Sequence, residues 1–229
     1  MKLFCVPYAG GSAMVAYSSW NDVIDNSIEV VPIEISGRGT RFADPLIDNV
    51  EELVDQIYKK YKNSFIEDEY MIFGHSMGSL IVFYLADKIR HENIRLPSRL
   101  FFSGKESPDI NKEDISYKLD DETFMQKIYN LGGTPKEIFE NKEFLQIFIP
   151  ILKNDYKLVE TCTYEREVQP FDCDITIFNG VDDILTKEDI YEWKKFTRKK
   201  FKVYNFEGGH FFINNHSKEI TDIIYNQTI

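Results

Sequence analysis

The sequence predicts an α/β fold, in which helices cover both faces of a mostly parallel, doubly wound sheet. Three observations lead to this prediction. Short apolar segments rich in β-branched residues alternate along the chain with amphipathic helical segments. Glycine-containing turns follow the first and the third of the apolar segments. One longer segment, residues 109–168, interrupts the alternation and is expected to be an insertion.

The composition favours one folded domain over residues 1–229. The 229 residues are 43% hydrophobic and 28% charged, which suits a single buried core. A net charge of −11 gives no electrostatic surface for nucleic acid or for an anionic membrane. The first apolar segment is too short for a signal peptide, and none approaches the ~18 residues of a transmembrane helix. We therefore expect a protein that binds neither nucleic acid nor membrane. We also expect a monomer, although the sequence itself does not identify the oligomeric state.

The cysteines indicate the compartment. The chain has three cysteines, an odd number, at Cys5, Cys162 and Cys173. Their spacing fits neither a disulfide framework nor a zinc site. Free cysteines are usually buried and reduced. We expect a cytoplasmic protein without a metal site.

The alternating elements can be assigned in order. Residues 28–35 are apolar and β-branched, which favours a strand. Val50, Leu53, Val54 and Ile57 have the i, i+3, i+4 spacing of a helix that is buried on one side. By the same criteria, strands are expected at 2–7, 28–35, 70–73, 99–103, 175–178 and 202–206. Helices are expected through Trp20, at 50–61, at 80–89, around Trp193 and at 217–225.

The insertion at 109–168 is predicted to be helical. Its patterns predict helices at 121–129, 141–149 and 151–161. It follows a strand end, on the side of an open parallel sheet where ligands bind. We expect a helical lid.

The strongest motif is Gly74-His75-Ser76-Met77-Gly78, between the strand at 70–73 and the helix at 80–89. This is the G-x-S-x-G nucleophile elbow of the α/β-hydrolase fold, in the strand–turn–helix context that supports it. The turn is so tight that only glycine fits two positions before and after the serine. Ser76 is the predicted nucleophile.

A serine hydroxyl needs a base to take its proton. His210, in the Glu207–Phe212 stretch after the sixth strand, has the place that the order Ser…Asp…His requires. The acid is expected after the fifth strand, where Asp182 and Asp183 are adjacent, and we choose Asp183. Some related folds place the acid after the preceding strand, where Asp109 would serve.

An oxyanion hole requires two backbone N–H groups directed at the developing charge. We expect the N–H of Met77, at the start of the helix after Ser76, and that of Ala9, in the glycine-rich turn 8–12. This turn has neither the G-x-G-x-x-G pattern nor the Lys-Ser/Thr pair of a nucleotide-binding loop. No cofactor is therefore expected.

The chain resembles the stand-alone type II thioesterases that accompany nonribosomal peptide and polyketide synthases. Ser36 departs from the family's usual proline and lies outside the expected triad. The matching stretches run almost from end to end: Val6–Ser12, Gly37–Arg41, Phe73–Gly78, Leu131–Pro135, Pro150–Asp155 and Gly208–Phe212.

This resemblance implies an editing enzyme that hydrolyses acyl groups from the phosphopantetheine thiol of carrier proteins, through Ser76, His210 and Asp183. The phosphopantetheine belongs to the partner, the carrier protein. Two alternatives stay open: a medium-chain acyl-carrier-protein thioesterase that releases fatty acids, and a general carboxylester hydrolase. Arg38 and Arg41 could contact a phosphate or a carrier helix, or could form structural ion pairs that fix their loop.

Overall fold

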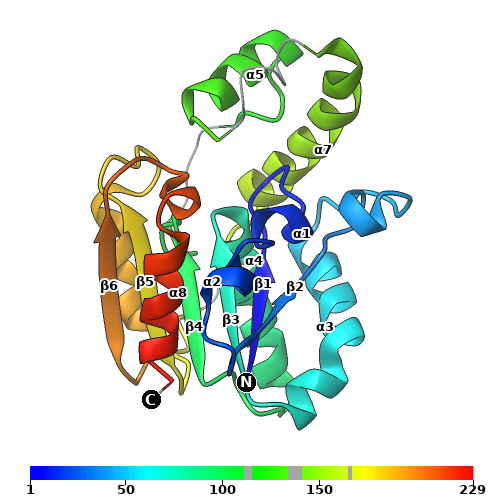
Figure 1. Cartoon of the computed structure of the whole chain (residues 1–229). Helices are drawn as coiled ribbons and strands as arrows, with labels where there is room; N and C mark the ends of the chain where they lie inside the picture. Colours follow the sequence, from blue (N-terminus) through cyan, green and yellow to red (C-terminus); the bar gives the residue numbers. More distant parts are fainter. Residues whose placement is uncertain (111–114, 134–140, 165–166, 229) are drawn as a thin grey trace.

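A computed structural model describes residues 1–110, 115–133, 141–164 and 167–228. Within these residues, six strands form one sheet in the order β2-β1-β3-β4-β5-β6, and every neighbouring pair is parallel (Figure 1). The predicted parallel α/β sheet is therefore confirmed. The strands are β1 (Lys2–Val6), β2 (Glu29–Pro32), β3 (Tyr70–His75), β4 (Arg99–Ser103), β5 (Asp174–Gly180) and β6 (Phe201–Phe206).

Helices cover both faces of the sheet, and the side chains of each strand alternate between the two layers. Phe4 and Val6 of β1 pack in the cluster that contains α3 and α4. Leu3 and Cys5 pack in the opposite cluster, with α2 and α8. The helices of these layers are α1 (Ala13–Ala16), α2 (Trp20–Val23), α3 (Val50–Glu67), α4 (Met77–His91) and α8 (Ser217–Asn226), with 3-10 turns η1 (Gly39–Arg41), η2 (Lys187–Phe196) and η3 (Phe212–Asn214).

Helix α3 begins where the sequence predicts it and ends later. The side chain of Asn49 accepts a hydrogen bond from the Glu52 N–H at 3.0 Å and caps the first turn. The helix was expected to end at residue 61 but continues to Glu67, because Phe65 is fully buried and extends the apolar face by another turn. Helix boundaries of this kind depend on tertiary packing.

The strand order places two turns next to each other. The chain leaves β1 toward β2 on one side and returns to β3 on the other, so β1 and β3 flank the switch point of the sheet. Val6 pairs with Gly74 in this register. The turn after β1 and the turn after β3 therefore meet at the carboxyl edge, where ligands bind in open α/β sheets.

The inserted segment contains two described helices, α5 (Asp121–Asn130) and α7 (Lys142–Thr161), which lie beyond the carboxyl ends of the strands (Figure 1). Two separate helices were predicted at 141–149 and 151–161, and this was wrong, because α7 runs through Pro150. Pro150 and Gln146 are both exposed, so the carbonyl that loses its helical partner can reach water. Positions 111–114, 134–140 and 165–166 of the expected insertion lie outside the described residues.

None of the helices that the structure describes is long and apolar enough to cross a membrane.

Candidate active site

Ser76 occupies a strained turn between β3 and α4. Its φ of 54° and ψ of −118° are rare for a residue other than glycine, and strain of this kind gathers at functional sites. A Cβ at Gly78 would lie 2.8 Å from the Pro7 carbonyl oxygen, and one at Gly74 would lie 2.6 Å from the Ser79 nitrogen. Both neighbours are backbone atoms. Gly78 therefore allows the turn to pack against the end of β1, and Gly74 allows the start of α4 to pack against β3.

A hydrogen-bonded chain links Ser76, His210 and Asp183. The His210 Nε2 lies 2.8 Å from the Ser76 Oγ, and the His210 Nδ1 lies 2.8 Å from the Asp183 Oδ2. A carboxylate only accepts, so Nδ1–H donates to Asp183, and Nε2 is left to accept the hydroxyl proton of Ser76. The Leu185 N–H donates to the other Asp183 oxygen at 2.9 Å. The structure thus brings together the three residues that the sequence singled out.

The two alternative acids lie elsewhere. Asp182 is exposed, and its N–H donates to the Gly208 carbonyl at 3.0 Å. Asp109 accepts from the Ser107 hydroxyl at 2.7 Å and pairs with Lys195. Asp183 is 4% exposed, so it is the carboxylate that is enclosed with the imidazole.

Behind His210 lies a second imidazole, that of His75, with the ring centroids 5.0 Å apart. His75 is fully buried, and its Nδ1 shares a 2.9 Å hydrogen bond with the Ser103 hydroxyl. Burial lowers the pKa of His75 well below its ordinary value, and the nearby His210 lowers it further. His75 therefore stays neutral and supports the site from behind.

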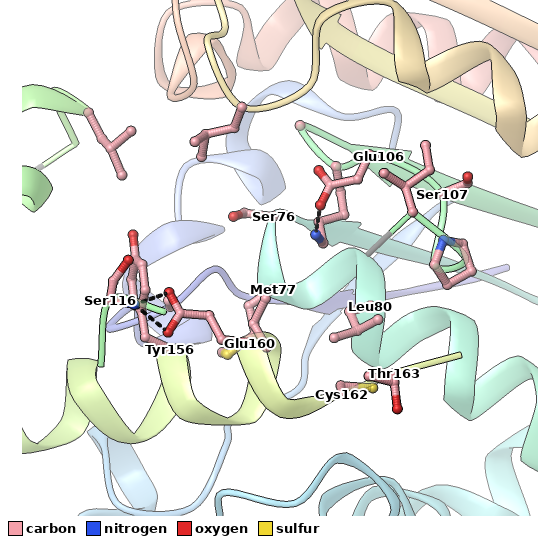
Figure 2. A pocket seen from close by; sticks show the side chains of 18 of the residues that line it. Ser76, Met77, Leu80, Glu106, Ser107, Ser116, Tyr156, Glu160, Cys162 and Thr163 are labelled. Atoms are coloured by element: carbon pink, nitrogen blue, oxygen red, sulfur yellow. Dashed lines mark hydrogen bonds and ion pairs between the residues drawn. The ribbon is translucent and has the colours of Figure 1, made fainter. Parts of the chain in front are cut away.

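Ser76, Met77 and Ala9 border one cavity of about 190 Å³ between the strand ends and α7. Its wall is mainly apolar next to the nucleophile, with Leu80 and Val159 among the lining residues. Figure 2 shows Glu160 of α7 in this wall, where its two oxygens accept hydrogen bonds from the Ser116 N–H at 2.8 and 2.9 Å. The Tyr117 N–H donates to the same carboxylate at 3.0 Å. The described residues hold no group of three or more His, Cys, Asp or Glu side chains suited to a metal ion.

The two arginines of the 37–41 loop are engaged inside the protein. Arg38 is 4% exposed and forms a bidentate pair with Asp155 of α7, with 2.6 Å between Nη2 and Oδ1. Arg41 donates to Asp44 at 2.7 Å and to Gln56 at 3.0 Å. Of the two roles that the sequence left open, the structure favours the ion pairs that fix the loop.

A family model described as "Thioesterase domain" matches residues 1–228. The chain belongs to the thioesterase family. It is 34% identical to the gramicidin S biosynthesis protein GrsT of Aneurinibacillus migulanus, over 99% of this chain and 88% of that protein. It is 32% identical to the medium-chain S-acyl fatty acid synthase thioesterase of Homo sapiens, over 95% of this chain and 83% of that enzyme.

Solved structures agree with the family assignment. ClbQ, from the colibactin NRPS/PKS pathway, superimposes with a TM-score of 0.92 and 38% identity, covering 99% of this thioesterase and 95% of ClbQ. RedJ, a thioesterase of prodiginine biosynthesis in Streptomyces coelicolor, superimposes with a TM-score of 0.90 and 26% identity, covering 97% of this thioesterase and 89% of RedJ. The α/β-hydrolase fold and the class of enzyme, a hydrolase that acts on thioesters, are thus as the sequence predicts.

Two buried carboxylates next to the site had not been predicted. Asp155 falls in a stretch that carried the family resemblance, yet its sequence context gave no sign of a partner. Glu34, which accepts hydrogen bonds from Ser12 and Ala13, has no motif around it.

Proposed function

We propose that this thioesterase hydrolyses acyl thioesters from the phosphopantetheine arm of carrier proteins, with Ser76, His210 and Asp183 as its catalytic triad. The observation that carries the proposal is the hydrogen-bonded chain from the Ser76 hydroxyl to the buried Asp183, at the edge of a largely apolar cavity. We place the enzyme in the cytoplasm as a monomer. Its three cysteines are free thiols, which suits a reducing compartment.

The geometry supports a two-step mechanism. His210 Nε2 takes the Ser76 proton as Oγ attacks the thioester carbonyl, and the tetrahedral oxyanion accepts from the N–H groups of Met77 and Ala9. The C–S bond then breaks, and His210 gives the proton to the sulfur. The carrier departs as a free thiol, and the acyl group stays on Ser76 as an ester. His210 then takes a proton from a water molecule, which attacks this ester. The bond between the acyl carbon and Oγ breaks, His210 returns the proton to Oγ, and the carboxylic acid leaves. Asp183 holds the imidazole tautomer throughout.

The relatives support a carrier-bound substrate in secondary metabolism. GrsT is a gramicidin S biosynthesis protein, and ClbQ belongs to an NRPS/PKS pathway. By analogy, this thioesterase would clear wrong or stalled acyl groups and return blocked synthase modules to use. The insertion would act as a lid, since α7 forms one wall of the cavity next to Ser76.

The similarity to the medium-chain fatty acid synthase thioesterase favours one second candidate, the release of fatty acids from an acyl carrier. The two activities differ in the acyl chain that they prefer. An editing enzyme should accept acetyl and other short groups, whereas a chain-terminating enzyme should need a medium-length chain.

The test is a panel of carrier proteins loaded with acyl groups of increasing length, beside the matching p-nitrophenyl esters. We expect wild type to release short acyl groups from the carrier with a higher kcat/KM than from the simple ester, and S76A to release none. A preference for medium chains would favour the second candidate. Equal or better hydrolysis of the simple esters would indicate a general carboxylester hydrolase and contradict the proposal.

A further inference from the structure

We propose that Asp155 of α7 is a positioning residue, which holds the turn after β1 in the conformation that directs the Ala9 N–H at the oxyanion. The inference rests on the proposed function, in which that N–H forms half of the oxyanion hole. The turn, residues 8–12, is here called the oxyanion turn. Nothing in the motif of the nucleophile elbow requires a carboxylate from the inserted segment at this point.

Asp155 reaches the oxyanion turn directly. The residue is 1% exposed, and its Oδ2 accepts a hydrogen bond from the Gly10 N–H at 2.7 Å. Arg38 pairs with both of its oxygens. The arginine compensates the buried negative charge of Asp155. A hydrogen bond to a buried carboxylate is stronger than one between neutral groups.

The hydrogen bond fixes the part of the turn that matters for Ala9. Peptide units are planar, so the Ala9 N–H shares a plane with the Tyr8 carbonyl, and the Gly10 N–H shares a plane with the Ala9 carbonyl. The Gly11 N–H donates to the Tyr8 oxygen at 3.0 Å, which orients the first plane. Asp155 orients the second. These two planes flank the Cα of Ala9, so fixing both of them fixes the φ and ψ angles of Ala9.

Apolar side chains of α7 close over the same point. Gly10 has φ +74°, and a Cβ placed on it would lie 2.8 Å from the Leu152 Cδ1 and 3.0 Å from the Phe148 ring. The helix therefore touches the turn itself and keeps water from the Asp155 hydrogen bond. Low local polarity strengthens that bond.

Glu34 fixes the other end of the oxyanion turn without involving α7. Its Oε2 accepts from the Ser12 hydroxyl at 2.6 Å, and its Oε1 accepts from the Ala13 N–H at 3.0 Å. Glu34 follows β2 and belongs to the body of the domain. Of these two carboxylates, only Asp155 makes the geometry of the turn depend on the docking of α7.

The central test replaces both members of the ion pair, in the double variant R38M/D155L. Apolar replacement of a buried pair is often neutral for stability, so the variant should fold, but the Gly10 N–H loses its acceptor. Loss of one oxyanion donor costs ~10²–10³ in kcat, and a loosened donor should cost about tenfold to a hundredfold. We expect this drop in kcat for an acyl-carrier thioester, with KM within about threefold of wild type.

The matched control is D48N/K157M. Lys157 also ties α7 to the body of the domain, through an ion pair with Asp48, but that pair is about half exposed, unlike Arg38–Asp155. This control should keep the wild-type kcat. A second variant, R38Q/D155N, tests the inference if R38M/D155L does not fold, because it keeps an acceptor oxygen for Gly10 and leaves no unpaired buried charge. We expect R38Q/D155N to fall between wild type and R38M/D155L.

Two further readouts separate positioning from general damage. The Ki of an acyl trifluoromethyl ketone, whose adduct places an oxyanion in the hole, should rise in R38M/D155L by the same factor as kcat falls. The labelling rate of Ser76 by a fluorophosphonate should fall likewise, and it needs no carrier substrate. If wild type fails on carrier thioesters, the proposed function is wrong, and the labelling rate still tests Asp155. Wild-type kcat, Ki and labelling rate in folded R38Q/D155N and R38M/D155L would overturn the inference.

Discussion

The nucleophile elbow and the oxyanion turn lie side by side at the ends of β3 and β1, yet different kinds of contact hold them. The elbow is maintained by close backbone contacts, because Gly74 and Gly78 allow an approach to the start of α4 and to the end of β1 that any side chain would block. The oxyanion turn is maintained by carboxylates from distant segments, and Gly10 and Asp155 are 145 positions apart. One half of the site is therefore held by backbone packing at glycines, whereas the other half is held by buried charged side chains.

This difference predicts how each half responds to change. A substitution in the elbow should remove activity through backbone collision, whatever the state of the inserted segment. A substitution that disturbs the inserted segment should act through the oxyanion turn or the His210 loop, and by smaller factors.

Asp183→Asn should cause the largest loss, because the amide can donate to Nδ1 and favour the wrong imidazole tautomer. In serine proteases the corresponding change costs ~10⁴ in kcat, and we expect a loss of that order. Asp182→Asn is the matched control and should stay near wild type, since Asp182 is exposed. Steady-state kinetics on an acyl-carrier thioester measure both. A dead Asp182→Asn beside an active Asp183→Asn would reverse the assignment of the acid.

Gly78→Ala tests the half of the site that is held by backbone packing. The new Cβ would lie 2.8 Å from the Pro7 carbonyl oxygen and 2.9 Å from the Val6 carbonyl carbon, and neither backbone atom can move freely. We expect a destabilisation of about 1–3 kcal/mol, as for overpacked cores. Displacing Ser76 by ~1 Å should lower kcat by about 10². Urea unfolding and kinetics together measure this, and wild-type values in both would show that the elbow tolerates a side chain.

Gly133→Ala tests the contact between the inserted segment and the loop of His210. A Cβ at Gly133 would overlap the Phe211 ring, whose centroid is 5.1 Å from that of His210. The shifted Phe211 ring should move His210 slightly. We expect kcat to drop about tenfold, which is less than the ~10² that a 1 Å misplacement of a reacting group can cost.

Gly132→Ala is the control for that variant. Its φ of +79° strains an alanine by about 1–2 kcal/mol, but the added Cβ would meet no described atom within 4 Å. Stability should fall while kcat stays near wild type. Equal kcat values for the two alanine variants would mean that the Phe211 contact does not affect catalysis.

His75 gives the smallest effect, a change in how stability depends on pH. Its pKa is lowered in the folded protein by burial, so below the ordinary His pKa of ~6.5 the unfolded chain binds a proton that the folded state excludes. Stability from the neutral His75 is present above that pH and is lost as the pH falls, by up to about 1.4 kcal/mol per pH unit. Unfolding of wild type and His75→Gln between pH 7 and pH 5 measures the difference, which parallel curves would contradict.

The same contrast explains how much could be predicted from the sequence. The strands, the elbow and the identity of Ser76 and His210 follow from local patterns, because hydrophobic period and glycine placement act over a few residues. The sequence favoured Asp183 over Asp182 only by its place in a turn. The hydrogen bond from His210 to the buried Asp183 carboxylate favours the same choice.

Other features depend on packing and could not be predicted. The continuous α7 buries Leu152, Asp155 and Leu158 along one side, and this outweighs the single hydrogen bond lost at Pro150. From the sequence, Arg38 could either contact a phosphate or a carrier helix, or form a structural ion pair. The choice stayed open because its partner, Asp155, lies 117 positions away. A partner at that separation leaves no pattern in one sequence.

The most direct test of the account is to identify the acyl-enzyme. Wild type is mixed with a carrier protein that bears an isotope-labelled acyl group on its phosphopantetheine, quenched in acid within the first turnover, and digested for mass spectrometry. We predict labelled acyl on the peptide that contains Ser76, with free carrier thiol formed in equal amount, and no label in Ser76→Ala. A carrier that keeps its acyl group, or a label on any other residue, would contradict the account.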